Sequence, residues 1–270
     1  MRLTVIIFVL LSVISTSIYP QSTVSQNVSN FELYAPQLKI NKKIWVYLPA
    51  DYQNSRKRYP VIYMHDGQNL FDRETSYAGE WKIDEYFDSN NTCQAIIIGI
   101  EHGGEKRIDE LTPFGNDKYG GGMGDKYLDF IVNTLKPYVD SNYKTKQNKK
   151  HTTIFGSSLG GLISFYAIFK HPKVFGNAGV FSPSFWFSEE IFNYIKDYNI
   201  ELKGKVYFMV GDQEGENMVE DMKRMISLLK RLQPKLKIHQ HIVINAEHNE
   251  KTWSEAFPQA IQWLNKKNKN

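Results

Sequence analysis

The feature that most constrains the fold is a five-residue stretch, Gly156-Ser157-Ser158-Leu159-Gly160, which fits the pattern G-x-S-x-G. An apolar segment typical of a strand, residues 152–155, runs directly into it, and one typical of a helix, residues 159–169, leaves it. A strand that turns this sharply into a helix holds the central residue at positive φ and has no room for side chains two positions before and after. The two glycines meet that need. The pattern therefore predicts an exposed Ser158 hydroxyl on a sharp turn at the end of a strand.

The rest of the chain alternates between strand and helix patterns, which we assign from hydrophobic periodicity. The predicted strands are residues 39–48, 61–64, 95–100, 152–155, 178–181, 206–210 and 238–244. The predicted helices are residues 127–139, 159–169, 218–232 and a final one containing Trp253, Phe257, Ile261 and Leu264. This alternation is typical of an α/β protein with a mostly parallel central sheet and helices on both faces. No Pro/Gly/Ser-rich break divides the chain, so we expect a single domain.

The beginning of the chain has the pattern of a secretory signal peptide. Arg2 precedes an almost purely apolar run, residues 3–14, and small residues follow at 15–17. The run is too short to span a bilayer comfortably, although an uncleaved anchor is the alternative. We expect residues 1–20 to be removed, export to the periplasm or the medium, and no stable membrane insertion afterwards. Residues 21–35 are then a linker or first strand, residues 36–265 the domain, and residues 266–270 a basic tail.

Composition excludes several classes of function. The net charge is only +4, and the lysine clusters at 144–150 and 266–269 lack the interleaved aromatic residues of a nucleic-acid platform. A single cysteine excludes an internal disulfide and C-x-x-C motifs. His65 and Asp66 are accompanied by no second group of metal ligands. We therefore predict no nucleic-acid partner, no metal and no cofactor.

A serine nucleophile needs a base, and in this order of elements the histidine comes last, after the acid. Of the seven histidines, His239, His241 and His248 lie late enough. His239 and His241 alternate inside a predicted strand, which favours a surface or packing role. His248 lies in a polar loop just past that strand, at the carboxyl end of the sheet, where the ligand sites of α/β proteins collect. We predict His248 as the base.

The acid is expected just beyond the strand at 206–210, where Gly211-Asp212-Gln213-Glu214 follows. Asp212 and Glu214 both qualify by position. The usual offset of three residues after the glycine favours Glu214, and Asp212 is short enough to bond backbone N–H groups of the turn instead. Glu214 would orient the imidazole of His248 and stabilise its charged form. The backbone N–H of Leu159, at the start of the helix, is aimed at a developing oxyanion.

Four stretches together resemble the esterase family that includes enterobactin esterase-like proteins, feruloyl and acetyl esterases, S-formylglutathione hydrolase and mycolyltransferases. They are MHDGQNLFD at 64–72, the glycine-serine turn at 156–161, residues 211–214 and residues 247–249. The resemblance covers about residues 36–265 and implies the α/β-hydrolase fold. It implies a triad of Ser158, Glu214 and His248, and a second oxyanion donor in the backbone N–H of Gln68. The loop at 65–68 departs from the S-formylglutathione hydrolase branch, so a glutathione-linked substrate is not expected.

We expect hydrolysis of a small carboxylic ester such as an acylated sugar, a hydroxycinnamate or a siderophore lactone. The alternatives are an acyltransferase with the same triad and a non-catalytic, hydrolase-like binding protein. Two further residues have open roles. Arg107 either forms a loop ion pair or grips an anionic substrate group. Trp186, with Trp81 and Phe187, either lines the substrate site or belongs to an aromatic core.

Overall fold

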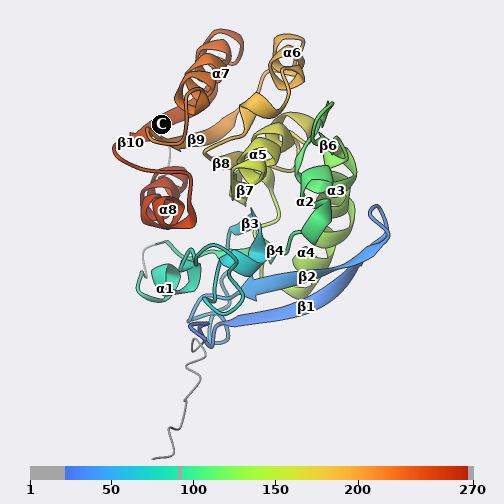
Figure 1. The fold of residues 1–270 in the computed structure, drawn as a ribbon. Helices are drawn as coiled ribbons and strands as arrows, with labels where there is room; N and C mark the ends of the chain where they lie inside the picture. The colour runs from blue at the N-terminus through green and yellow to red at the C-terminus, as the bar shows by residue number, and fades with distance from the viewer. Residues whose placement is uncertain (1–21, 91–92, 267–270) are drawn as a thin grey trace, which may run out of the picture.

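The computed structural model describes residues 22–90 and 93–266, so the predicted signal peptide lies outside the described residues. Within the described part, eight strands form one sheet in the order β1-β2-β4-β3-β7-β8-β9-β10 (Figure 1). They are β1 (Val28–Ala35), β2 (Ile40–Tyr47), β3 (Val61–His65), β4 (Ile96–Ile100), β7 (Thr152–Ser157), β8 (Asn177–Phe181), β9 (Gly204–Gly211) and β10 (Leu236–Val243). The run from β4 to β10 is parallel, and β1 and β2 add an antiparallel edge.

Helices cover both faces of this sheet, as the sequence predicts (Figure 1). The helices are α1 (Ile83–Asp88), α2 (Arg107–Leu111), α3 (Gly124–Phe130), α4 (Lys136–Asn142), α5 (Leu159–Lys170), α6 (Glu190–Lys196), α7 (Met218–Leu232) and α8 (Glu250–Asn265). A π-helical turn, Ile131–Leu135, joins α3 to α4, so the predicted helix at 127–139 is one continuous rod with a bulge. A two-stranded ribbon of β5 (Gly115–Asn116) and β6 (Gly120–Gly121) precedes it.

Side chains that alternate along the central strands divide the core into two layers. On β3, Val61 and Tyr63 belong to the buried cluster that includes side chains of α3, α4, α5 and α7, while Ile62 and Met64 belong to the cluster that includes side chains of α1 and α8. A strand buried on both faces reads as a continuous apolar run, which is why its sequence shows no polar alternation. Burying each such side chain stabilises the fold by about 1.5–3 kcal/mol. This core fixes the carboxyl ends of the parallel strands.

The segment before residue 36 belongs to the fold. β1 pairs with β2 along its whole length, from Val28 opposite Tyr47 to Ala35 opposite Ile40. β1 is therefore an edge strand of the central sheet. Among the described residues, no helix has both the length and the apolar character needed to cross a membrane.

Candidate active site

Ser158 lies at the sharp turn between β7 and α5, with φ of 58° and ψ of −124°. A Cβ on Gly156 would lie 2.7 Å from the carbonyl carbon of Gly160 and 2.8 Å from the ring of His65. The turn is therefore sterically possible only with hydrogen at that position, which is the reason the motif needs its first glycine. The backbone N–H of Ser158 donates to the Phe181 carbonyl at 3.0 Å, which ties the turn to the next strand.

The Ser158 hydroxyl contacts a second serine. Its Oγ lies 3.3 Å from Oγ of Ser184, whose backbone N–H donates to the Ser158 carbonyl at 3.2 Å. Among the described residues, no hydrogen bond joins Ser158 to His248. In proteins without bound substrate, catalytic hydrogen bonds are often long and tighten only in the complex.

His248 and Glu214 are bonded to each other. Nδ1 of His248 lies 2.9 Å from Oε2 of Glu214, and the Glu214 side chain is 0% exposed while that of His248 is 34% exposed. Because an ionised carboxylate only accepts, Nδ1 is the nitrogen that carries hydrogen, and Nε2 is left as the acceptor. The other oxygen of Glu214 accepts the N–H of Gly211 at 2.6 Å and the hydroxyl of Ser182 at 2.7 Å.

Two residues that the sequence analysis did not identify extend this contact. The indole N–H of Trp253, in the first turn of α8, donates to Ser182 Oγ at 2.8 Å, and Ser182 in turn donates to Glu214. The Trp253 ring also stands edge-on to the His248 imidazole, with centroids 5.0 Å apart. Ser182 has a φ of 43°, an uncommon conformation for serine. Trp253 therefore packs directly against His248 and is linked to Glu214 by hydrogen bonds through Ser182.

Asp212 is engaged elsewhere. Its Oδ1 accepts the backbone N–H of Asn245 at 2.7 Å and the side chain of Gln213 at 3.2 Å. Its own backbone N–H donates to the Val243 carbonyl at 3.0 Å. Asp212 therefore joins the turn after β9 to the turn after β10. Of the two acids that the sequence leaves open, Glu214 is the one that contacts His248.

The two backbone N–H groups predicted as oxyanion donors lie at adjacent strand ends. Leu159 begins α5, and Gln68 lies in the short 3-10 turn Gly67–Asn69 that follows β3. β3 and β7 are neighbours in the sheet, with Met64 opposite Phe155. In the described part of the chain, neither N–H donates to a loop or turn carbonyl. The first N–H groups of a helix have no partner within it, so both are available to an anionic oxygen.

Arg107 forms a bidentate ion pair with Asp66. Its Nε and Nη2 lie 2.7 and 2.9 Å from the two carboxylate oxygens, and the side chains are 29% and 13% exposed. Burial tends to raise the pKa of Asp66, but the charge and hydrogen bonds of Arg107 outweigh it and the pKa is lowered. The pair is thus not local to the loop at 107–110. It joins α2 to the residue that follows β3, two positions before Gln68.

A set of buried polar side chains lies near this ion pair. His65 Nδ1 lies 2.8 Å from the hydroxyl of Tyr127, and Lys42 pairs with Glu110 at 2.7 Å with both side chains under 5% exposed. Burial lowers the pKa of His65 to about 3, so the imidazole is neutral. His65 and Asp66 therefore face different partners, and neither joins a group of metal ligands within the described residues.

The remaining candidates divide between surface and core. Trp186 is 50% exposed and stands edge-on to Tyr119, two positions after Ser184. Trp81 and Phe187, by contrast, are buried in the core. On β10, His239 stacks on Tyr207 and His241 bonds its hydroxyl at 3.0 Å, so both histidines pack within the strand layer. Only Trp186 of the three aromatic candidates is thus available to a ligand near the serine turn.

Comparison with known proteins identifies the family. Residues 35–264 match the family model described as "Putative esterase". The chain belongs to this esterase family. It is accordingly a carboxylic ester hydrolase with an α/β fold, as the sequence analysis predicts.

This esterase is similar to proteins from bacteria and fungi. It is 29% identical to the uncharacterized protein YbbA of Bacillus subtilis over 248 residues, which cover 85% of this chain and 95% of the relative. It is 30% identical to the siderophore triacetylfusarinine C esterase of Aspergillus fumigatus over 142 residues, 51% of this chain and 48% of that protein. The crystal structure of the BES protein from Bacillus cereus superposes with a TM-score of 0.72 at 21% identity, covering 93% of this chain and all of that one. At 21% identity, the likeness to the Bacillus cereus structure shows a shared fold.

Proposed function

We propose that this esterase transfers the acyl group of a small ester to water, with Ser158 as nucleophile, His248 as general base and Glu214 as the residue that orients it. The observation that carries the proposal is the 2.9 Å contact between His248 Nδ1 and the fully buried Glu214 carboxylate. It supports a fixed tautomer with Nε2 ready to accept a proton. The positive φ of Ser158 supports a nucleophile exposed at a strained turn.

The reaction proceeds in two halves. Ser158 Oγ bonds to the ester carbonyl carbon as His248 Nε2 takes its proton, and the carbonyl oxygen becomes an oxyanion. The N–H groups of Gln68 and Leu159 stabilise that oxygen, and the dipole of α5 adds to the effect. His248 then protonates the leaving alcohol, and the acyl group stays on Ser158. A water molecule then attacks the acyl carbon as His248 Nε2 takes its proton, and the bond to Ser158 Oγ breaks as His248 returns that proton to the serine and the acid leaves.

We propose a small ester such as an acylated sugar, a hydroxycinnamate or a siderophore lactone as the substrate. The similarity to a fungal siderophore esterase supports the last of these. Arg107 supports an anionic or catecholate group, since Asp66 uses its Nε and Nη2 and leaves Nη1 without a hydrogen bond among the described residues. Trp186 supplies an exposed ring against which an aromatic group can stack.

The test is a hydrolysis panel with the purified full chain. It includes short-chain nitrophenyl esters, a feruloylated sugar, an acetylated sugar and a catecholate trilactone. We expect turnover of at least one natural-type ester and none by the Ser158→Ala variant. Arg107→Gln should raise KM for the anionic substrate and leave KM for nitrophenyl acetate unchanged. Equal KM changes for both would contradict a substrate role for Arg107.

A further inference from the structure

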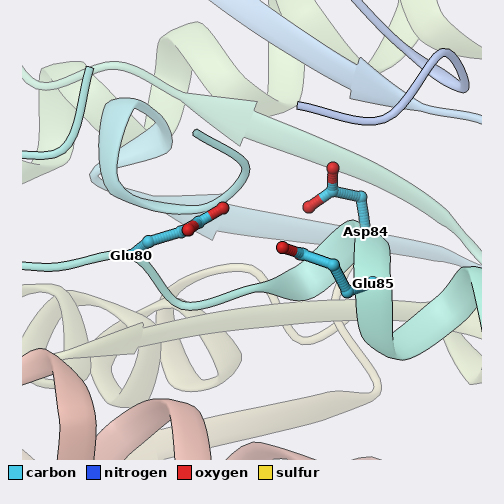
Figure 2. Close-up of side chains that lie close together, drawn as sticks. All are labelled: Glu80, Asp84 and Glu85. Atoms are coloured by element: carbon cyan, nitrogen blue, oxygen red, sulfur yellow. The ribbon is translucent and has the colours of Figure 1, made fainter. Parts of the chain in front are cut away.

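Three carboxylates gather at the start of α1, on the far side of β3 from the helix that follows Ser158. Glu80 lies in the loop before the helix, and Asp84 and Glu85 lie in its first turn. One oxygen from each lies within 4.8 Å of the others, and Figure 2 shows the three side chains turned toward a common space. Like charges this close repel one another, so the arrangement needs a compensating positive charge or a proton.

The oxygens of this cluster are only partly satisfied by the protein. Asp84 is 0% exposed; its Oδ2 accepts the N–H of Ser25 at 2.7 Å, while its Oδ1 is buried without a hydrogen-bond partner. Glu80 repeats the pattern, because Oε1 accepts from the Thr23 hydroxyl at 2.8 Å and Oε2 is buried without a partner. Buried carboxylate oxygens are rarely left in this state unless an ion or water completes them.

The described part of the chain forms no salt bridge with the cluster, although the more distant charge of Lys82 acts on Glu80. No lysine, arginine or histidine nitrogen described by the structure lies within 4.0 Å of these three carboxylates. Glu85 is exposed, so the cluster opens to solvent on one side and an ion has a route of entry. In Figure 2 one oxygen of Asp84 turns toward the ends of the two glutamates.

We propose that Glu80, Asp84 and Glu85 bind a divalent cation, and that calcium is the ion this set of ligands suits. The ligands are all hard oxygens, which calcium and magnesium prefer. Calcium accepts several protein carboxylates in irregular geometry, whereas magnesium demands near-ideal octahedral geometry and is usually held by only one or two carboxylates. One oxygen from each of three carboxylates, all within 4.8 Å of one another, therefore suits calcium better than magnesium. This proposal departs from the sequence analysis, which predicts no metal.

The site would couple two segments that are far apart in sequence. Thr23 and Ser25, at the beginning of the described chain, donate to the same Glu80 and Asp84 that would hold the ion. The loop before α1 is tied to the turn after β3, since the Trp81 N–H donates to the Asn69 carbonyl at 2.8 Å. A bound cation would therefore stabilise the N-terminal segment and the loop beside Gln68 without touching Ser158. The proposal does not depend on the assignment of the triad.

A shared proton is the competing explanation for the cluster. Burial raises the pKa of Asp84 to about 8, and a hydrogen bond with Glu85 and the charge of Glu85 add to the effect. A proton between the two carboxylates would lower their repulsion with no ion present. At constant pH, a cation site predicts that calcium raises Tm, whereas a shared proton predicts that calcium leaves Tm unchanged.

The experiment measures thermal melting and terbium luminescence of the purified full chain after treatment with a chelator. Calcium is titrated at pH 7.5, and terbium, which replaces calcium, is excited through Trp81, the residue after Glu80. We expect calcium at about 100-fold above its Kd to raise Tm by about 5 °C. Asp84→Asn and Glu85→Gln should abolish both the rise and the terbium signal. Should Asp84→Asn fail to fold, the exposed Glu85 provides the second variant.

Asp88→Asn is the matched control. Asp88 lies in the same helix and accepts from Ser25 and Tyr47, but it is not one of the three ligands. It should lower Tm without removing the calcium response. The proposal is overturned if calcium leaves the wild-type Tm unchanged while acidification raises it, or if wild type and Glu85→Gln respond equally. A response to magnesium at lower concentration than calcium overturns the assignment to calcium.

Discussion

The imidazole of His248 and the carboxylate of Glu214 meet at 2.9 Å from loops that follow two neighbouring strands, β10 and β9. Their meeting depends on the parallel pairing of those strands, which brings their carboxyl ends to the same edge of the sheet. The other carboxylate oxygen of Glu214 accepts hydrogen bonds from Gly211 and Ser182, so the orientation of Glu214 is fixed before any substrate binds. This preorganisation is what a triad acid must supply.

The choice of acid is open to direct test. Glu214→Gln should lower kcat by about 10²–10⁴-fold, because the amide can no longer hold the productive tautomer of His248. Asp212→Asn should cost about tenfold or less, since Asp212 bonds the Asn245 backbone and acts only through loop geometry. Both variants are compared at the same pH, with folding checked by thermal melts. A crippled Asp212→Asn beside a nearly normal Glu214→Gln would assign the acid to Asp212.

Trp253 should act as a positioning residue through Ser182. Trp253→Phe keeps a ring edge-on to His248 and removes the N–H that donates to Ser182 Oγ. One lost hydrogen bond of about 1 kcal/mol corresponds to about fivefold in kcat if it is expressed fully in the transition state. We expect that decrease in kcat with KM nearly unchanged, together with a lower Tm from the space that the smaller ring leaves in the core. A fall in Tm with normal kcat would mean that the indole N–H serves stability alone.

The glycines of the serine turn should differ in their tolerance of alanine. A Cβ on Gly156 meets backbone atoms at 2.7 and 2.8 Å, whereas the nearest atom to one on Gly160 is His65 Cβ at 3.3 Å. Gly156→Ala should therefore destabilise the fold by about 1–3 kcal/mol or more. Gly160→Ala, which gains helix propensity, should cost less. Urea unfolding of the two variants checks the order, and a less stable Gly160→Ala would contradict the steric account of the motif.

The Asp66–Arg107 pair gives a pH dependence with a defined sign. Because the pKa of Asp66 is lowered from its ordinary value of 3.8, the folded chain binds fewer protons than the unfolded chain in that range. The stability this pair contributes is complete above about pH 4 and is lost as the pH falls further. Asp66→Asn, which suits the left-handed backbone at that position, should thus lower Tm more at pH 7 than at pH 3. An equal difference at both pH values would show that the pair does not contribute through charge.

Local pattern predicted the sheet, the serine turn and the parallel strands, because buried strands and G-x-S-x-G have short, periodic signatures. Helices α1 and α6 were not predicted, since six or seven residues are too few to show a period of 3.6. The contact of Trp253 with Ser182 joins residues 71 positions apart, which no local pattern encodes. The acidic cluster at residues 80–85 was not predicted for a related reason. Its hydrogen-bond donors, Thr23 and Ser25, lie more than 50 positions earlier in the sequence.

The central claim is that Ser158 is the nucleophile, and covalent labelling tests it most directly. The purified chain is treated with a fluorophosphonate, and the mass increase and residual ester hydrolysis are measured for wild type, Ser158→Ala and Ser157→Ala. Ser157 is the neighbouring serine and has Phe155 and Leu159, not glycines, two positions before and after it, so it is the matched control. We expect one label per chain and loss of hydrolysis in wild type and Ser157→Ala, and neither label nor hydrolysis in Ser158→Ala. Stoichiometric labelling of Ser158→Ala with retained hydrolysis would contradict the account.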